Sequence, residues 1–286
     1  MKLACNYLKE TVLLAQQGKI DIDYFKFPAL WHQCKDVNSD DITGFVHFIE
    51  ETSKIRPVLI HGIGMTLNPG ARNFRQSVNI EKTKKILSLC VANGISVHID
   101  SFDYSLTADE NIKIITDNVL WLREQLPDLD FLALENNEIN PYHRYEHMRI
   151  DADPELISGV VYKTGSDFLL DISHAYISAM YMKLEHMDYI SRLPLDKLYE
   201  IHINGWIDTG SDIMAHTSIN ETEYEILSEL LKKHTPKIIT CEYGRENDRI
   251  NAGVPVVSVD GVINTLVMDE IVEQVSRLRS ILHFAQ

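Results

Sequence analysis

The stretch PVLIHGIG, residues 57–64, shows the pattern that decides the fold: a short, continuously apolar run that ends in a histidine. Comparable runs recur along the chain, each rich in Val, Ile, Leu or Phe and bounded by polar or amphipathic sequence. Strands that are apolar on both faces are typical of a parallel sheet covered by helices. The predicted strands are residues 2–7, 22–27, 57–61, 95–100, 130–135, 167–171, 198–203 and 237–242.

Amphipathic segments alternate with these strands. Helical spacing of apolar residues predicts helices at residues 81–92, 109–125, 221–233 and 262–284. Asn220 is a suitable N-cap for the third of these helices, and Gly94 and Gly165 stand where a helix should stop before the next strand. Residues 136–153 and 206–220 are predicted to be long polar loops that contribute to a functional site.

Eight strands that alternate with helices predict an α/β fold, namely a closed (β/α)8 TIM barrel formed as a single domain by residues 1–286. The length is close to the roughly 250 residues of such barrels. A doubly wound open sheet is the structural alternative. The chain has no GxGxxG after its first strand and no GxxxxGK[ST] anywhere, so the fingerprints of nucleotide binding are missing.

Composition and charge narrow the class of protein. The formal net charge is -15 and the sequence has no basic stripe, which argues against a nucleic-acid partner. None of the four cysteines forms a CxxC pair, as expected of free thiols in a reducing compartment. The sequence shows no signal-peptide pattern and no apolar stretch near the ~18 residues of a membrane span. We therefore predict a cytoplasmic protein without a membrane partner.

The last residues of the predicted strands carry the chemistry. Six consecutive strands each deliver one imidazole or carboxylate to the same rim, where the active sites of barrels lie. Buried charges of this kind are costly without a counter-charge, and metal ions supply one. A nitrogen and oxygen ligand set without thiolate suits iron, manganese or zinc. The six residues are His61, His98, Glu135, Asp171, His202 and Glu242.

The order of short motifs around these residues resembles one family. The motifs are HGxG at 61–64, SxH at 96–98, LEN at 134–136, LDxxHxYxSA at 170–179, HxxG at 202–205, and a late Glu at 242. Together they are similar to the multinuclear non-heme iron-dependent oxidative enzymes, the methanobactin-maturase-like barrels that modify ribosomally made peptides. The resemblance covers roughly residues 57–244.

The resemblance implies a cofactor, a reaction and partners. The cofactor would be two or three iron ions, as Fe2+ and Fe3+, with dioxygen as co-substrate. The substrate would be a residue of a precursor peptide, often a cysteine, and a small partner protein would present that peptide. The implied iron ligands are His61, His98, Glu135, Asp171, His202, His216 and Glu242.

The chain departs from the family pattern at several positions. Trp206 stands where a second histidine follows the HxxG motif, and Met214 stands where an aspartate precedes His216. Asp208 or Asp212 is the candidate replacement for that aspartate, and we include Asp212 among the predicted ligands. His174, preceded by serine, stands where the family has paired asparagines.

Further roles follow from position along the motifs. We predict catalytic roles for Glu135, which as a two-oxygen ligand can also bridge two metal ions, and for His174 and Asn204. The predicted substrate-binding residues are Asn137, Tyr176 and Arg245.

Three other functions remain open from the sequence. A xylose-isomerase-like sugar isomerase or epimerase also places His, Glu and Asp around a divalent metal. A metal-dependent endonuclease has the same barrel shape, although the acidic charge argues against it. A non-catalytic metal- or peptide-binding barrel is the third alternative. Metal identity separates these functions, because the isomerase needs one manganese or magnesium ion and the nuclease three zinc ions.

Overall fold

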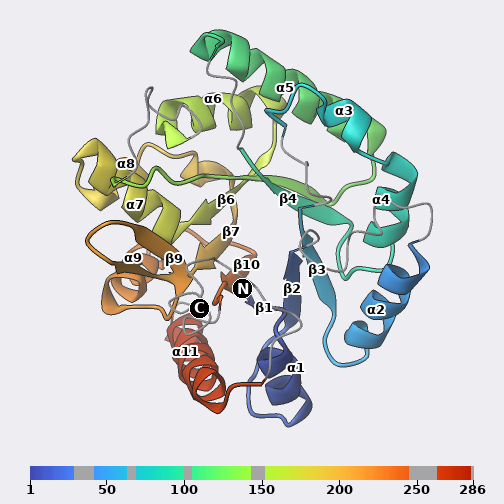
Figure 1. Ribbon diagram of the computed structural model, residues 1–286, viewed down its shortest axis with the longest axis vertical. Helices are drawn as coiled ribbons and strands as arrows, with labels where there is room; N and C mark the ends of the chain where they lie inside the picture. Colours follow the sequence, from blue (N-terminus) through green and yellow to red (C-terminus); the bar gives the residue numbers. More distant parts are fainter. Residues whose placement is uncertain (29–41, 63–68, 100–104, 143–151, 245–262, 285–286) are drawn as a thin grey trace.

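The computed structural model describes residues 1–28, 42–62, 69–99, 105–142, 152–244 and 263–284, which form a closed parallel barrel wrapped by helices (Figure 1). The barrel strands are β1 (Lys2–Asn6), β2 (Tyr24–Pro28), β3 (Val58–His61), β4 (Gly94–His98), β5 (Phe131–Glu135), β6 (Asp167–Asp171), β7 (Leu198–Ile203) and β10 (Ile238–Cys241). Neighbours pair in parallel in this order, and β10 closes the barrel against β1. The predicted barrel and its eight strands are confirmed.

Helices follow the strands and form the outer layer. They are α1 (Lys9–Gln16), α2 (Thr43–Ser53), α3 (Phe74–Ser77), α4 (Ile80–Leu87), α5 (Ala108–Gln125), α6 (Pro154–Thr164), α7 (Ile172–Met182), α8 (His186–Ile190), the 3-10 turn η3 (Leu195–Lys197), α9 (Glu221–Leu231) and α11 (Thr265–Phe284). Helix α11 packs beside α1, so the end of the described chain covers its beginning (Figure 1).

Local sequence signals set the ends of several helices. Thr107 and Glu110 form a reciprocal capping box at the start of α5, which satisfies backbone N–H groups that have no partner inside the helix. Asp153 caps α6, and Gly165 ends it with a left-handed φ of 64° that favours glycine. The predicted helix stop at Gly165 is confirmed, and Gly94 begins β4 as predicted.

The sequence-based predictions of one helix end and one loop were wrong. The helix predicted at residues 81–92 ends at Leu87, because the backbone N–H of Val91 bonds to the carbonyl of Val58 on β3 instead of continuing the helix. Residues 206–220, predicted to be a loop, contain most of an antiparallel hairpin formed by β8 (Gly205–Asp208) and β9 (Ile213–Thr217). In the other predicted loop, residues 136–142 are irregular, and 143–151 lie outside the described residues.

Side chains alternate along each strand between the helix-covered face and the barrel interior, as the pleat requires. Cys5 and Cys241 pack in the large apolar cluster between barrel and helices. Ala4, Leu59 and Ile238 form a small apolar cluster near the strand starts. Polar residues fill the interior above it, and the ionisable residues of the strand ends lie at the top.

Candidate metal centre

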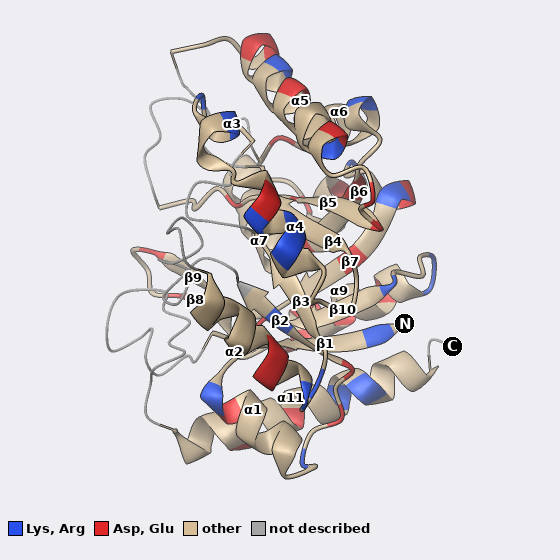
Figure 2. Ribbon diagram, turned by 90° about the vertical axis from the view of Figure 1, so that its right-hand side faces the viewer, with Lys and Arg blue, Asp and Glu red and all other residues tan. Residues whose placement is uncertain are grey.

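Barrel closure brings the six predicted strand-end residues into one cluster. Register places His98 beside Glu135 on neighbouring strands, and Asp171 beside His202. The β8–β9 hairpin lies at this end of the barrel, opposite the N-terminus (Figure 2). Five of the six residues are buried, and His98 is partly exposed.

His61, His98 and Glu135 meet at one side of the cluster. The Nε2 atoms of the two histidines lie 3.2 Å apart, and they lie 3.2 and 3.3 Å from the same Glu135 oxygen, Oε2. Three ligand atoms from β3, β4 and β5 therefore converge on a single point. Two imidazoles with one carboxylate are a set that open non-heme Fe(II) sites use.

The Glu135 carboxylate faces two groups of ligands at once. Its Oε2 atom faces His61 and His98, and its Oε1 atom faces His202, whose Nδ1 lies 3.4 Å away. Neither oxygen receives a hydrogen bond of normal geometry from the described residues, although the carboxylate is completely buried. A buried carboxylate normally has hydrogen-bond partners, so this arrangement fits a group that binds cations on both sides.

His202 and Glu242 form the other side of the cluster. His202 Nδ1 lies 3.0 Å from Glu242 Oε2, and His216 Nε2 from the hairpin lies 3.4 Å from the same oxygen. His216 has a φ of 62°, which is uncommon for a residue other than glycine. Its backbone is held by hydrogen bonds, because its N–H donates to Asn204 Oδ1 and its carbonyl accepts from Gly244.

Asp171 lies between these two sides and is held by its neighbours. Its Oδ1 atom accepts from the backbone N–H of His174, and its Oδ2 atom accepts from Asn204 Nδ2, both at 2.8 Å. Asn136 fixes the backbone of Asp171 through two hydrogen bonds. Asn204 thus links Asp171 to His216, and so positions two predicted ligands.

Among the residues that the structure describes, four sets of three or four His, Asp or Glu residues have ligand atoms that lie within 4.8 Å of one another. The sets are His61–His98–Glu135, His61–His202–Glu242, Asp171–His174–His216 and Glu135–Asp171–His202–Glu242. Their nitrogen and oxygen atoms fit a first-row divalent metal ion, and so does a buried Glu135 carboxylate that receives no hydrogen bond of normal geometry from the described residues. The cluster could therefore bind metal ions.

The electrostatics of the cluster indicate that a positive charge is needed there. Burial raises the pKa of Asp171 to about 7, and the carboxylates of Glu242 and Glu135 add to this effect. Burial alone would lower the pKa of His202, but Glu242 and Glu135 hold it well above its ordinary value. Without metal, protons supply the positive charge between the carboxylates. Bound cations would take over that role.

A second polar layer lies beneath the cluster and was missed by sequence reasoning. Lys26 Nζ donates to both oxygens of Glu200 at 2.8 and 2.7 Å, and to Ser96 Oγ at 3.0 Å. Thr240 Oγ1 donates to Glu200 at 2.6 Å. The available signal was a lysine inside β2 and a second ionisable residue, Glu200, inside β7, in strands that are mostly apolar.

This layer contacts two of the candidate ligand histidines from below. Ser96 Oγ lies 2.8 Å from His61 Nδ1, and Glu200 Oε1 lies 3.2 Å from His202 Nε2. A ring nitrogen that donates its proton downward leaves the other nitrogen free to bind metal. Burial alone would raise the pKa of Glu200, but Lys26 and His202 lower it to about 2, so this carboxylate accepts hydrogen bonds.

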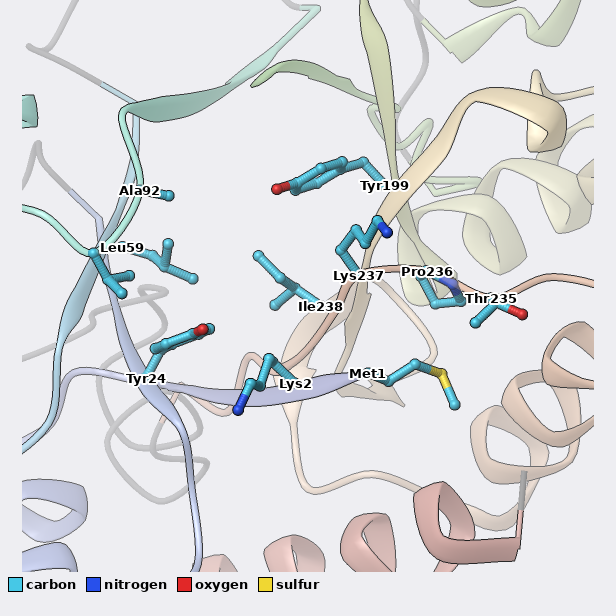
Figure 3. Close-up of a pocket in the computed structure, with 11 residues that line it drawn as sticks. Met1, Lys2, Tyr24, Leu59, Ala92, Tyr199, Thr235, Pro236, Lys237 and Ile238 are labelled. Atoms are coloured by element: carbon cyan, nitrogen blue, oxygen red, sulfur yellow. The ribbon is translucent and has the colours of Figure 1, made fainter. Parts of the chain in front are cut away.

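The opposite end of the barrel has a pocket of about 320 Å³. Tyr24, Leu59, Tyr199 and Ile238 point into it from the strand starts (Figure 3). None of the cluster residues lines this pocket, so we place the functional site at the strand ends.

Comparison with known proteins identifies the family. A sequence model described as "RiPP precursor modification enzyme MbnB/TglH/ChrH" matches residues 40–251, which is well over half of the chain. The chain belongs to this family. RiPP stands for ribosomally synthesised and post-translationally modified peptide. The family resemblance inferred from the motifs is therefore confirmed.

Relatives of the chain include UPF0276 proteins. A UPF0276 protein of Vibrio parahaemolyticus is 26% identical over 191 residues, which is 58% of this chain and 62% of the relative. A UPF0276 protein of Psychromonas ingrahamii is 23% identical over 189 residues, with 64% of each protein covered. The chain thus spans slightly less than two thirds of the length of these relatives.

Solved structures support the fold alone. A xylose isomerase domain protein from Alicyclobacillus acidocaldarius has a TM-score of 0.62 at 15% identity, covering 100% of this chain and 99% of its own. Such low identity says nothing about the reaction.

The remaining predicted residues of this RiPP-modification family member lie at different distances from the cluster. Asp212, predicted as a ligand, accepts a hydrogen bond from Asn140 Nδ2 at 2.6 Å and belongs to none of the four ligand sets found among the described residues. Tyr176 stacks on Trp206, with ring centroids 5.0 Å apart. Asn137 is buried, and its Oδ1 accepts from the backbone N–H of Glu138. Arg245 lies outside the described residues.

The helices seen in Figure 2 carry both basic and acidic residues. Within the described part of the chain, no helix combines the length and apolar character needed to cross a bilayer.

Proposed function

We propose that this protein is a metal-dependent oxidative enzyme that uses iron and dioxygen to modify a residue of a ribosomally made precursor peptide. Cysteine is the first candidate for that residue. Family membership supports the peptide substrate. The observation that carries the metal-dependent part is the buried Glu135 carboxylate, which has imidazole nitrogens 3.2–3.4 Å from each of its oxygens and no normal hydrogen bond from the described residues.

Two metal positions share Glu135 in this proposal. His61, His98 and Glu135 Oε2 would hold one ion, and Glu135 Oε1, Asp171, His202 and Glu242 would hold the other. When bound, iron supplies one-electron chemistry with dioxygen and a Lewis-acid position for a substrate heteroatom such as a thiolate. Glu135 would contribute one oxygen to each position.

The protein's own residues would determine how the substrate reaches the cluster and how the candidate ligands are oriented. His98 and His216 are the most exposed members of the cluster, with 38% and 28% of their side chains accessible. Substrate therefore approaches from their side of the barrel mouth. Asn204 is a positioning residue, because it holds the carboxylate of Asp171 with one amide atom and the backbone of His216 with the other.

The residues that would contact the peptide are proposed from their positions along the sequence motifs. Asn137, Tyr176 and Arg245 are the candidate peptide-binding residues, and a small partner protein would present the peptide. The Tyr176–Trp206 stack supports this placement, because it is a partly exposed aromatic surface that joins α7 to the hairpin carrying His216. The reaction would take place in the cytoplasm.

Anaerobic purification followed by metal counting and Mössbauer spectroscopy tests the metal part. We expect at least two iron ions per chain in the wild type, and loss of iron in Glu135→Gln. The matched control is Glu124→Gln, a change at an exposed position on α5 that should keep the full iron content. A wild-type protein that binds no metal, or one manganese or magnesium ion with sugar isomerase activity, would contradict the proposal.

Co-expression with a short precursor peptide encoded beside the gene tests the reaction. We expect a change in peptide mass that requires both dioxygen and the iron-loaded protein. An unchanged peptide mass, in the presence of iron and dioxygen and any adjacent small protein, would argue for a non-catalytic binding protein.

A further inference from the structure

The pocket at the strand-start end of the barrel has no part in the function proposed above. Its volume of about 320 Å³ lies at the lower end of the roughly 300–1,000 Å³ that small-molecule sites occupy. It therefore has room for a molecule with a single ring. Tyr24 from β2 and Tyr199 from β7 point into the pocket, with Leu59 and Ile238 between them (Figure 3).

The floor of the pocket is apolar and separates it from the metal cluster. Ala4, Leu59 and Ile238 pack together inside the barrel, and each is 4% exposed or less. Along β10 and the residue after it, Ile238 is followed on the same face by Thr240 and then by Glu242. The floor and the cluster are thus different layers of the barrel interior, and a molecule in the pocket would not touch the cluster.

One wall of the pocket is a stack of aromatic rings. Tyr199 packs on Phe131 with ring centroids 4.4 Å apart and an interplanar angle of 23°. Gly94 leaves the space for this stack, because a Cβ atom there would lie 2.1 Å from the Phe131 ring. The stack holds the Tyr199 ring in place, so a flat ring can pack beside it without ordering a mobile side chain.

The two tyrosine hydroxyls are available to a ligand. Neither Tyr24 nor Tyr199 uses its hydroxyl in a hydrogen bond with another residue that the structure describes. Burial, with the charges of Asp167 and Glu200, raises the pKa of Tyr199 to about 12, so its hydroxyl keeps its proton at neutral pH and can donate it. Two hydroxyl donors in one pocket suit an acceptor group with two oxygens, such as a carboxylate.

The charged side chains that line the pocket are all basic. Lys2 and Lys237 line it, and no carboxylate does so among the described residues, although the chain has 42 acidic and only 27 basic residues. Lys2 is paired with Asp23 at 2.8 Å. Lys237 forms no ion pair with a described residue, so its charge is available to a bound anion.

We propose that this pocket is a binding site for a small aromatic carboxylate. The ring would lie on the floor formed by Leu59 and Ile238, beside Tyr199. The carboxylate would accept hydrogen bonds from the tyrosine hydroxyls and face Lys237. The site shares no residue with the metal centre, so this inference goes beyond the proposed function and does not rest on it.

Titration with benzoate, followed by the broadening of its proton NMR signals, tests the proposal. Metal-free and Zn2+-loaded protein should bind benzoate equally, because no cluster residue lines the pocket. Ala92→Leu places a larger side chain where Ala92 points into the pocket and should abolish binding (Figure 3). Tyr199→Phe removes one hydrogen bond and should weaken binding about fivefold.

Lys237→Met removes the available charge and should weaken benzoate binding about threefold, as expected for an exposed ion pair. The matched control is Lys85→Met, a change at an exposed position on α4 that should leave binding unchanged. Benzyl alcohol has the same ring without the charge and should bind more weakly than benzoate. Equal binding of the two probes would overturn the proposal of a carboxylate ligand.

The other outcomes test where the probe binds. Unchanged binding to Ala92→Leu and Tyr199→Phe would place benzoate elsewhere. Benzoate that binds only the Zn2+-loaded protein would lie at the metal centre, and no binding at millimolar concentration would refute the site. Circular dichroism confirms that each variant is folded, and Tyr199→Phe, which keeps the ring, decides the test if Ala92→Leu does not fold. None of these outcomes changes the case for the proposed function.

Discussion

Lys26 Nζ lies 2.7 Å from Glu200 Oε2, and both side chains are buried inside the barrel although they are 174 residues apart in the sequence. The ion pair is supported by Thr240 and Ser96, and it lies directly below His61 and His202. The charged layer therefore contacts these two candidate ligand histidines from the side away from the barrel mouth.

Removal of one charge of this pair should destabilise the metal-free protein. Lys26→Met leaves Glu200 buried without its cation, which should lower the free energy of unfolding by about 3–5 kcal/mol. Urea unfolding measures this change. The double variant Lys26→Met/Glu200→Gln removes both charges and should recover a large part of the loss. Equal losses for Lys26→Met and the double variant would show that the pair is not coupled.

Loss of the Ser96 hydroxyl should weaken metal binding. Ser96→Ala removes the group that lies 2.8 Å from His61 Nδ1, so the imidazole loses its orientation. We expect metal affinity to fall by about 10–100-fold, as for other residues that hold a ligand histidine. Anaerobic titration with Co2+ measures this affinity. Ser158→Ala on α6, whose hydroxyl donates to the carbonyl of Arg192, should leave it unchanged.

A side chain at Gly205 should displace the hairpin. A Cβ atom there would lie 1.7 Å from the carbonyl oxygen of Ser218, and backbone cannot move as easily as a side chain tip. Gly205→Ala should cost about 1–3 kcal/mol of stability and should weaken metal binding at His216. Thermal unfolding and metal counting report the two effects.

Gly159→Ala is the matched control for this prediction. Gly159 lies within α6, and no atom would lie within 4 Å of an added Cβ. Alanine is favoured over glycine in a helix by about 0.5–1 kcal/mol, so this variant should be slightly more stable. A Gly205→Ala protein as stable as the wild type, with its full metal content, would show that the hairpin adjusts freely.

Metal affinity should rise with pH from about 6 to 9. Burial raises the pKa of Asp171 to about 7 in the metal-free protein, and Asp171, Glu138 and other carboxylates raise that of His174 to about 9 against the effect of burial. Below these values protons are bound at Asp171 and His174 and oppose the binding of cations beside them; above these values the protons are released. Binding at pH 7 should therefore release protons.

Calorimetry of Co2+ binding in two buffers with different ionisation enthalpies counts these protons. Asp171→Asn should release fewer protons and bind metal more weakly. An affinity that does not change between pH 6 and 9 would mean that the buried ligands are already deprotonated without metal.

The strand-end pattern predicted much of the site because it is local. Every barrel strand has the period and apolar character that the pleat and the helical cover require, and residues at the same point of successive strands meet when the barrel closes. His61, His98, Glu135, Asp171 and His202 could therefore be grouped from their places in the sequence alone.

Contacts that depend on packing across the barrel could not be predicted in this way. The pairing of Lys26 with Glu200 joins β2 to β7, and no local spacing indicates it. The same holds for the β8–β9 hairpin, whose register brings His216 to Glu242 but leaves Asp212 bonded to Asn140.

The sequence by itself thus determined the barrel, its strand ends and the kind of ligand at each, because hydrophobic periodicity and residue type are properties of short segments. Only the tertiary structure decided which nitrogen of each histidine faces the cluster and how Glu135 is shared between two sides. Those features depend on hydrogen bonds between segments that are far apart in the chain. These segments come within bonding distance only when the barrel closes.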